Sequence, residues 1–116
     1  MMEDALVNTS TVLQLARGDR ERAVLYVNAF LNGVEPQLTL LRESEVNRDF
    51  AQIKRTAHNL KSQARYMGMS SVASHLERLE QLAAEEGWPD GLSEGTHEAI
   101  AMMEKAIGEL RQFAES

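Results

Sequence analysis

The sequence predicts an all-α domain: an antiparallel up-down four-helix bundle preceded by a short extra N-terminal helix. The chain of 116 residues contains only two prolines. Valine, isoleucine, threonine and aromatic residues never gather into the alternating runs that are typical of strands. Apolar residues instead recur three and four positions apart in long segments with short connections, which favours antiparallel packing. No repeat or long linker is present, so we expect residues 1–116 to form a single domain.

The first two helices are predicted on either side of the turn sequence RGDRE. A short helix should cover Met2 to about Leu15, and a long one should run from about Asp19 to Glu43. Pro36 lies inside the second helix, where it removes a backbone donor and crowds the carbonyl of Asn32. We therefore expect a kink at the proline and not an end to the helix. The apolar stripe of this helix consists of Val24, Val27, Phe30, Leu31, Val34, Leu38 and Leu41.

The third helix should begin near Asn47, a favourable N-cap, and end at Gly68, a favourable residue just past a helix C-terminus. The fourth should start after Ser70 and end near Gly87. Apolar residues recur along the inner face of both helices. They are Phe50, Ile53, Ala57, Leu60, Ala64 and Met67 in the third helix, and Val72, Leu76, Leu79 and Ala83 in the fourth.

The stretch GWPDGLSEG, residues 87–95, is rich in glycine and proline and is predicted to be a loop. Trp88 in this loop is expected to cover one end of the bundle. A last helix should run from about Thr96 to Ala114. Its buried face is predicted to contain Ile100, Met103, Ile107, Leu110 and Phe113.

Composition excludes several classes of function. The chain has no cysteine, which rules out disulfides, thiolate metal sites and a cysteine nucleophile. No apolar run is long enough for a membrane span, and the N-terminus lacks the pattern of a signal peptide. We therefore expect a cytoplasmic protein without membrane contact. A net charge of −6 argues against a nucleic-acid partner, although a local basic patch could still bind an acidic protein.

Such a basic patch is predicted on the third helix, which has no Asp or Glu from Ala51 to Tyr66. At about 100° per residue, His58 lies roughly 130° from the centre of the apolar stripe and should point away from the core. Like charges one turn apart repel and cost some stability. An anionic partner that binds to this face would relieve the repulsion. An ordinary solvated surface is the alternative. The residues within roughly 60° of His58 are Ala51, Lys54, Arg55, Lys61, Ser62 and Arg65.

The stretch Ala57-His58-Asn59-Leu60-Lys61-Ser62, with Gly68 ten residues after the histidine, resembles the signature of histidine-containing phosphotransfer (HPt) domains. The SHLERLE segment that ends at Glu80 is similar to the family's next helix, which carries an acidic or amide residue at that point. The similarity in size and helix order extends over the whole chain. The family fold is a four-helix bundle, which agrees with the prediction from periodicity.

The resemblance implies a role for each matching residue. His58 would be the phosphoacceptor and would react through its outer ring nitrogen. Lys61 would lie beside the phosphoryl group and stabilise its charge. Glu80 would accept a hydrogen bond from the other ring nitrogen, and Gly68 would allow the turn into the next helix. The family usually has glycine after the lysine, where this chain has Ser62.

The chemistry of these residue types agrees with these roles. A neutral imidazole is nucleophilic near pH 7. A carboxylate on one ring nitrogen leaves the lone pair of the other one free. Glu80 lies on the flank of its helix that also carries the small residues Ala73 and Ala84, so we expect this helix to approach the third one closely.

The resemblance implies a phosphoryl carrier of a two-component phosphorelay, not an enzyme with its own ATP site. Its partners would be receiver-domain aspartates and a hybrid sensor kinase. No cofactor is expected, because the chain lacks a glycine-rich phosphate loop and an acidic cluster that could bind Mg²⁺. The resemblance implies that the receiver domain would bring the Mg²⁺. A monomer is expected. The partner surface would include Lys54, Arg55, Ser62, Arg65, Tyr66 and Met69, whereas Met67 is expected in the core.

Two other functions compete with this hypothesis. The same basic face could dock an acidic partner without any covalent step. A metal-binding bundle would need the E-x-x-H pattern twice, whereas it occurs once, from Glu94 to His97. His75 lies next to the apolar stripe of its helix, so we expect a packed and hydrogen-bonded histidine there.

Overall fold

A computed structural model describes residues 5–85 and 87–116 of the chain. The all-helical prediction is confirmed, because these residues form five α-helices and no strand. Within this part of the chain, no helix combines the length and the apolar character that crossing a membrane requires. The helices are α1 (Thr9–Leu15), α2 (Arg20–Val46), α3 (Phe50–Tyr66), α4 (Ser70–Ala83) and α5 (Leu92–Glu115).

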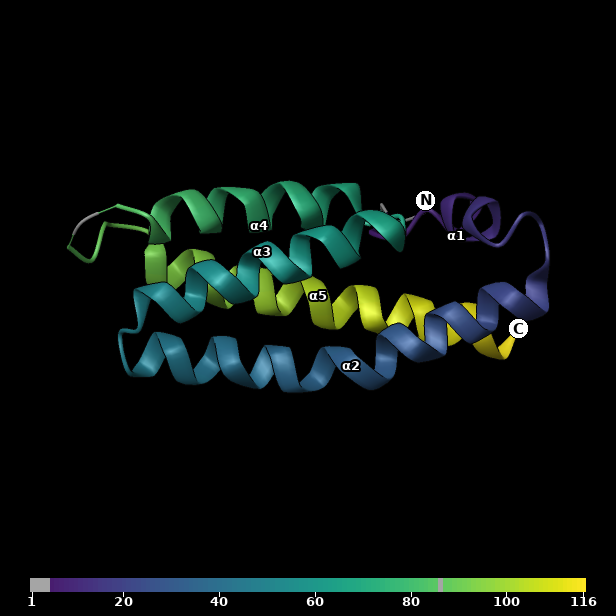
Figure 1. The fold of residues 1–116 in the computed structure, drawn as a ribbon, viewed down its shortest axis with the longest axis horizontal. Coiled ribbons are helices and arrows are strands. Elements are labelled where there is room, and N and C mark those ends of the chain that lie inside the picture. The colour runs from purple at the N-terminus through teal and green to yellow at the C-terminus, as the bar shows by residue number, and fades with distance from the viewer. Residues whose placement is uncertain (1–4, 86) are drawn as a thin grey trace.

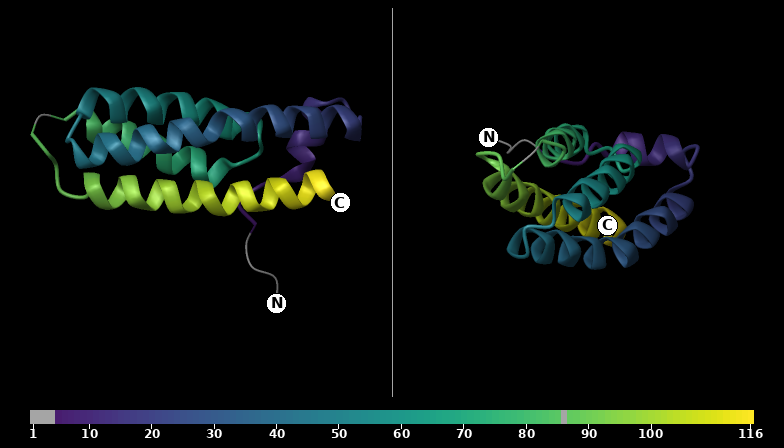
Figure 2. Two further views of the ribbon diagram at one scale, coloured as in Figure 1. Left: turned by 90° about the horizontal axis from the view of Figure 1, so that it is seen from below. Right: turned by 60° about the vertical axis from the view of Figure 1, so that its left-hand side comes forward.

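The four longer helices, α2 to α5, lie side by side along the long axis of the molecule (Figure 1). The chain direction reverses from each of them to the next. Helix α3 packs most extensively against α4 and also contacts α2, while α5 packs on both α2 and α4. Two further views show the same grouping, with α1 lying near the beginning of α2 (Figure 2). The closest helix pair is thus the one that carries the predicted site.

Helix α2 is stabilised at its start by Asp19, whose carboxylate accepts a hydrogen bond from the backbone N–H of Arg22 at 3.2 Å. It continues through Pro36 to Val46, three residues past the predicted end. Ser44, in this additional turn, is buried and donates to the carbonyl of Leu40 at 2.5 Å. Most of the predicted stripe is buried. Within it, Val24 and Leu31 are only half-buried.

The prediction that Asn47 caps α3 is wrong. Asn47 is the residue that ends α2, and the next residue, Arg48, has a positive φ of 54° that reverses the chain. Asp49 is the N-cap of α3, and its carboxylate accepts a hydrogen bond from the N–H of Gln52 at 3.1 Å. The turn between α2 and α3 therefore lies about three residues later in the chain than predicted, because α2 extends to Val46 and α3 begins at Phe50.

The loop between α4 and α5 also differs from the prediction at both ends. Helix α4 ends at Ala83, and α5 begins at Leu92 instead of near Thr96. Gly91 has a φ of 89° and accepts a backbone hydrogen bond from Gly95 at 2.8 Å, which starts the helix. Leu92 is fully buried. Burial of this side chain outweighs the low helix propensity of Gly95.

Trp88 covers one end of the bundle, as expected. Its ring lies 5.1 Å from that of Phe50 between centroids, and the guanidinium of Arg48 lies 4.7 Å above it. Its indole N–H donates to the hydroxyl of Ser93 at 3.1 Å. The loop tryptophan thus links the start of α3 to the start of α5.

Gly68, between α3 and α4, satisfies two constraints at once. Its φ of 72° lies in the left-handed region that favours glycine. A Cβ at this position would also overlap the carbonyl oxygen of Asn8, because the N-terminal segment runs directly against the turn. The N–H of Asn8 donates to the carbonyl of Gly68 at 2.8 Å. The turn that joins α3 to α4 therefore also anchors the start of α1.

Substituting Gly68→Ala should reduce the free energy of unfolding by about 2–4 kcal/mol, since it combines left-handed strain with a backbone overlap. Gly18→Ala is the matched control, because Gly18 has a φ of 81° with open space around it. That control should cost only about 1 kcal/mol. Urea unfolding of both variants measures the difference. Equal losses would show that the contact with Asn8 does not constrain the turn.

Candidate functional site

His58 lies in the middle of α3 and points away from the core, as predicted. Its side chain is 59% exposed, although the neighbouring Ala57 and Leu60 are fully buried. Burial of these neighbours on a regular helix fixes the backbone beneath the imidazole. The ring is therefore accessible to a partner and held on a rigid element.

Glu80 from α4 reaches the histidine. One of its carboxylate oxygens lies 3.0 Å from Nδ1 of His58, and the other accepts a hydrogen bond from Nζ of Lys61 at 2.7 Å. Ala73 is buried, which agrees with a close approach of the two helices, whereas Ala84 is exposed and has no part in it. The structure thus brings together the three residues that the sequence placed at the site.

Lys61 differs from the other basic residues of α3 because its side chain is only 12% exposed. Its ammonium group is turned toward Glu80, whose side chain is itself 20% exposed. The family resemblance implies a place for Lys61 beside an incoming phosphoryl group, but it does not indicate this ion pair. Lys61 and His58 therefore share the carboxylate of Glu80, with Lys61 on Oε1 and His58 on Oε2.

The shared carboxylate is ionised. The hydrogen bond from Lys61 holds the pKa of the Glu80 carboxyl below its ordinary value, partly opposed by burial and reinforced by His58. An ionised carboxylate can only accept hydrogen bonds, so Nδ1 of His58 carries the proton in this contact. The lone pair of the neutral ring is then on Nε2 and is available to an electrophile.

The basic face of α3 is partly neutralised from α4. Besides the pair of Lys61 with Glu80, Arg65 lies 3.8 Å from Glu77, so acidic partners absent from the α3 sequence come from the next helix. Within the described part of the chain, Lys54 and Arg55 have no carboxylate within ion-pair distance. A cavity of about 390 Å³ beside the histidine is lined by Ala51, Lys54, Arg55, His58, Asn59 and Glu80.

Three further residues were expected on the partner surface. Ser62 and Tyr66 are exposed, the latter to 63%. Met69 is fully buried, so its assignment to the partner surface is wrong. It follows the turn at Gly68, whose geometry directs it into the core. Met67 is also buried, as predicted.

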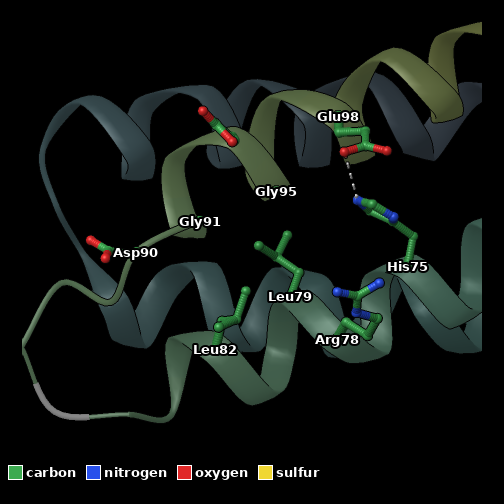
Figure 3. A pocket seen from close by; sticks show the side chains of 9 residues that line it. His75, Arg78, Leu79, Leu82, Asp90, Gly91, Gly95 and Glu98 are labelled. Atoms are coloured by element: carbon green, nitrogen blue, oxygen red, sulfur yellow. Dashed lines mark ion pairs between the residues drawn. The ribbon is translucent and has the colours of Figure 1, made fainter.

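The other two histidines lie elsewhere. His75 is half-buried, and its Nε2 lies 3.8 Å from Glu98 at one side of a cavity of about 380 Å³ between α4 and the start of α5 (Figure 3). The ring is packed, as expected, with 19% of its side chain exposed. The separation from Glu98 is too long for a hydrogen bond, so the expected hydrogen bond is not found among the described residues. His97 is exposed and lies 2.7 Å from Glu45 of α2.

Sequence reasoning missed two features of this region. Asn59 lines the cavity beside His58, and no sequence signal distinguishes it from any exposed residue of α3. The contact of His97 with Glu45 joins positions 52 residues apart, which no local pattern indicates. The E-x-x-H pattern pairs His97 only with Glu94, a neighbour on the same helix.

The pKa of the Glu80 carboxyl should rise in a Lys61→Met variant, because the hydrogen bond that most lowers it is lost. Carbon-13 NMR of the glutamate carboxyls measures this directly. In the wild type, the midpoint for Glu80 should lie below the ordinary glutamate value of about 4.3. An unshifted wild-type midpoint would contradict the ion pair.

Glu80 should also make stability depend on pH. Since its pKa is lower in the folded than in the unfolded protein, its contribution is complete above the unfolded value and is lost as pH falls through the folded one. The free energy of unfolding of the Glu80→Gln variant should therefore fall less steeply than that of the wild type as pH decreases below about 5. Glu77→Gln is the control, because Glu77 is 48% exposed and 3.8 Å from its partner. Equal slopes in the two variants would refute the assignment.

Comparison with protein families gives one finding. The model of the Hpt domain matches residues 25–113, which is most of the chain and spans α2 to α5 almost completely. Comparisons with curated proteins and with solved structures give no match. The protein therefore belongs to the Hpt domain family, whose members are histidine phosphotransfer carriers of two-component phosphorelays.

Proposed function

We propose that this protein carries a phosphoryl group on Nε2 of His58, accepting it from receiver-domain aspartates and passing it to them in a phosphorelay that begins with a hybrid sensor kinase. The observation that carries the proposal is the exposed imidazole whose Nδ1 lies 3.0 Å from a carboxylate of the neighbouring helix. That contact leaves Nε2 available on a ring that is 59% exposed. Family membership supplies the class of partner.

The transfer step uses the lone pair of Nε2. It attacks the phosphorus of an aspartyl phosphate, a P–N bond forms, the P–O bond to the aspartate breaks, and the aspartate leaves as a carboxylate. The ring gains positive charge while Nδ1–H stays hydrogen-bonded to Glu80, which stabilises that charge. The reverse sequence returns the phosphoryl group to a receiver. We infer that the receiver supplies Mg²⁺ and that this chain uses no ATP site of its own.

Lys61 is proposed to stabilise the charge of the phosphoryl oxygens. It lies one helical turn after His58, and its ammonium is bound to the same carboxylate, so we propose that it turns toward a phosphoryl group on Nε2. The exposed hydroxyl of Ser62 is available on the same face to donate to a phosphoryl oxygen. Both groups would act together with the partner's own residues.

The partner surface is proposed to comprise the exposed residues around His58. Lys54 and Arg55 are not neutralised by carboxylates among the described residues, so they can attract an acidic receiver surface. Arg65 is 57% exposed and only loosely paired, and Tyr66 adds an aromatic contact at the edge. Electrostatic attraction of this kind chiefly accelerates association and weakens with salt.

A single chain is proposed to be sufficient for this function. His58, Lys61 and Glu80 all come from the adjacent helices α3 and α4, so no second copy has to complete the site. We propose that the whole chain acts as one antiparallel four-helix unit in the cytoplasm, with α1 as an additional helix. A monomer is then the active form.

His58→Gln should abolish phosphoryl transfer from a phosphorylated receiver domain, because glutamine cannot act as a nucleophile. The wild type should acquire label that is labile in acid and stable in base, as expected of a phosphohistidine. His75→Gln is the control and should be labelled like the wild type. If the wild type bound the receiver without acquiring label, the protein would instead be a non-catalytic docking module. Label that persisted in His58→Gln would place the acceptor elsewhere.

Glu80→Ala should slow transfer about tenfold or more, since a hydrogen bond to a charged group contributes roughly 1.5–3 kcal/mol. The affinity for the receiver should change little, because Glu80 is largely covered. Rapid-quench transfer kinetics and binding isotherms separate the two effects. Glu77→Ala, one turn earlier on α4, is the matched control. A rate equal to that of the wild type would contradict the assigned role.

A further inference from the structure

A second histidine is held by a carboxylate on the face formed by α2 and α5. Nε2 of His97 lies 2.7 Å from Oε1 of Glu45. The histidine is 64% exposed and the glutamate 19% exposed. These fractions nearly equal those of the His58 and Glu80 pair, which are 59% and 20%. In both pairs an accessible imidazole on one helix is oriented by a largely covered carboxylate on another.

The Glu45 carboxylate is fixed on its other oxygen as well. Ser93 donates its hydroxyl to Oε2 of Glu45 at 3.3 Å, and the same hydroxyl accepts the indole N–H of Trp88 at 3.1 Å. Trp88 is held by its contact with Phe50, whose ring is tilted by 49° to the indole. The hydrogen bonds from Trp88 to Ser93 and from Ser93 to Glu45 thus help to position the Glu45 carboxylate. At the other site, Lys61 positions the carboxylate of Glu80.

Orientation by Glu45 determines which nitrogen of His97 is free. A carboxylate accepts hydrogen bonds, so Nε2 is the protonated nitrogen and the lone pair of the neutral ring is on Nδ1. Within the described part of the chain, Nδ1 has no hydrogen-bond partner. This is the opposite nitrogen from the one left free at His58, where Nδ1 is bound and Nε2 is free.

His97 lines a cavity together with a positively charged side chain, that of Arg42. Arg42 and His97 both line a space of about 330 Å³ that also borders Ile100 and Glu104. Arg42 is paired with Glu104 at 2.7 Å, but the two side chains are 44% and 55% exposed. Exposed pairs of this kind contribute little to stability, so Arg42 is able to exchange Glu104 for another anion.

We propose that His97 is a second phosphoacceptor, modified on Nδ1 by small phosphoryl donors that carry a labile P–N or acyl phosphate bond. The proposal does not depend on His58 being a phosphoacceptor, because the two sites share no residue. Small donors are favoured over an acidic protein on this face, where the carboxylates of Glu45 and Glu104 accompany a single arginine in the cavity.

Phosphoramidate is a suitable small donor for this reaction. The Nδ1 lone pair attacks phosphorus, a new P–N bond forms to the ring, and the P–N bond to the amine breaks with release of ammonia. The proton on Nε2 remains between the ring and Glu45, whose negative charge stabilises the phosphorylated imidazolium. Arg42 then faces the phosphoryl oxygens.

The test uses the full chain with the His58→Gln substitution, treated with phosphoramidate at neutral pH. Phosphorus-31 NMR distinguishes phosphate on Nδ1 from phosphate on Nε2, and mass spectrometry locates the modified residue. We expect Nδ1-phosphohistidine at His97. The label should be absent after the further change His97→Gln and should form about tenfold more slowly with Glu45→Gln. Arg42→Gln, which keeps the pair of His97 with Glu45, should slow it about threefold.

The internal reference is His75, which is half-buried and 3.8 Å from its carboxylate. It should remain unlabelled under conditions that label His97, a comparison that needs no substitution at Glu45. Equal labelling of His75 and His97, label on Nε2 of His97, or no label in His58→Gln would each overturn the proposal. Failure of receiver transfer to His58 would leave these results unchanged, so the two proposals fail independently.

Discussion

One carboxylate, that of Glu80, determines the geometry of the candidate site. It accepts hydrogen bonds from Lys61 and His58 on separate oxygens, at 2.7 and 3.0 Å, and so ties α4 to α3. The three groups are mutually dependent. Lysine and glutamate could not be covered to this extent without each other, because removing either partner leaves a charge with poor solvation. The histidine can be exposed and still be oriented, because its Nδ1 contacts the largely covered carboxylate of Glu80.

The fold provides this arrangement through a short connection between two closely packed helices. Gly68 allows the chain to reverse within a few residues, and the N-terminal segment packs directly on the turn. Small or buried residues between the helices, such as Ala64 and Ala73, keep the separation short enough for a glutamate to reach an imidazole. Packing thus supplies what the chemistry requires, which is fixed distance and fixed orientation.

Much of this could be predicted from the sequence, because helical periodicity places side chains by angle. It placed His58 outside the core and Met67 inside it. Periodicity cannot give distances between helices, so the ion pair that covers Lys61 was not foreseen. Nor does it describe turns, which is why Met69 was assigned to the surface. The early start of α5 at Leu92 had a similar cause, since burial of that leucine outweighs glycine's poor helix propensity.

The three histidines of the chain show that environment, and not residue type, determines chemical availability. His58 and His97 are exposed and each lies within hydrogen-bond distance of a largely covered glutamate. His75 is half-buried, and the carboxylate of Glu98 lies 3.8 Å from its ring. The partners of the first two come from other helices, through contacts that join residues 22 and 52 positions apart. The family resemblance already implied the pair of His58 with Glu80, whereas the pair of His97 with Glu45 is seen only in the folded chain.

The most direct test of the account is the tautomer of the neutral His58 ring, measured by long-range proton–nitrogen correlation NMR in alkaline solution. The account predicts a proton on Nδ1 and a bare Nε2, the form imposed by the ionised Glu80 carboxylate. A ring protonated on Nε2 would contradict it, because this nitrogen would then have no lone pair with which to accept a phosphoryl group.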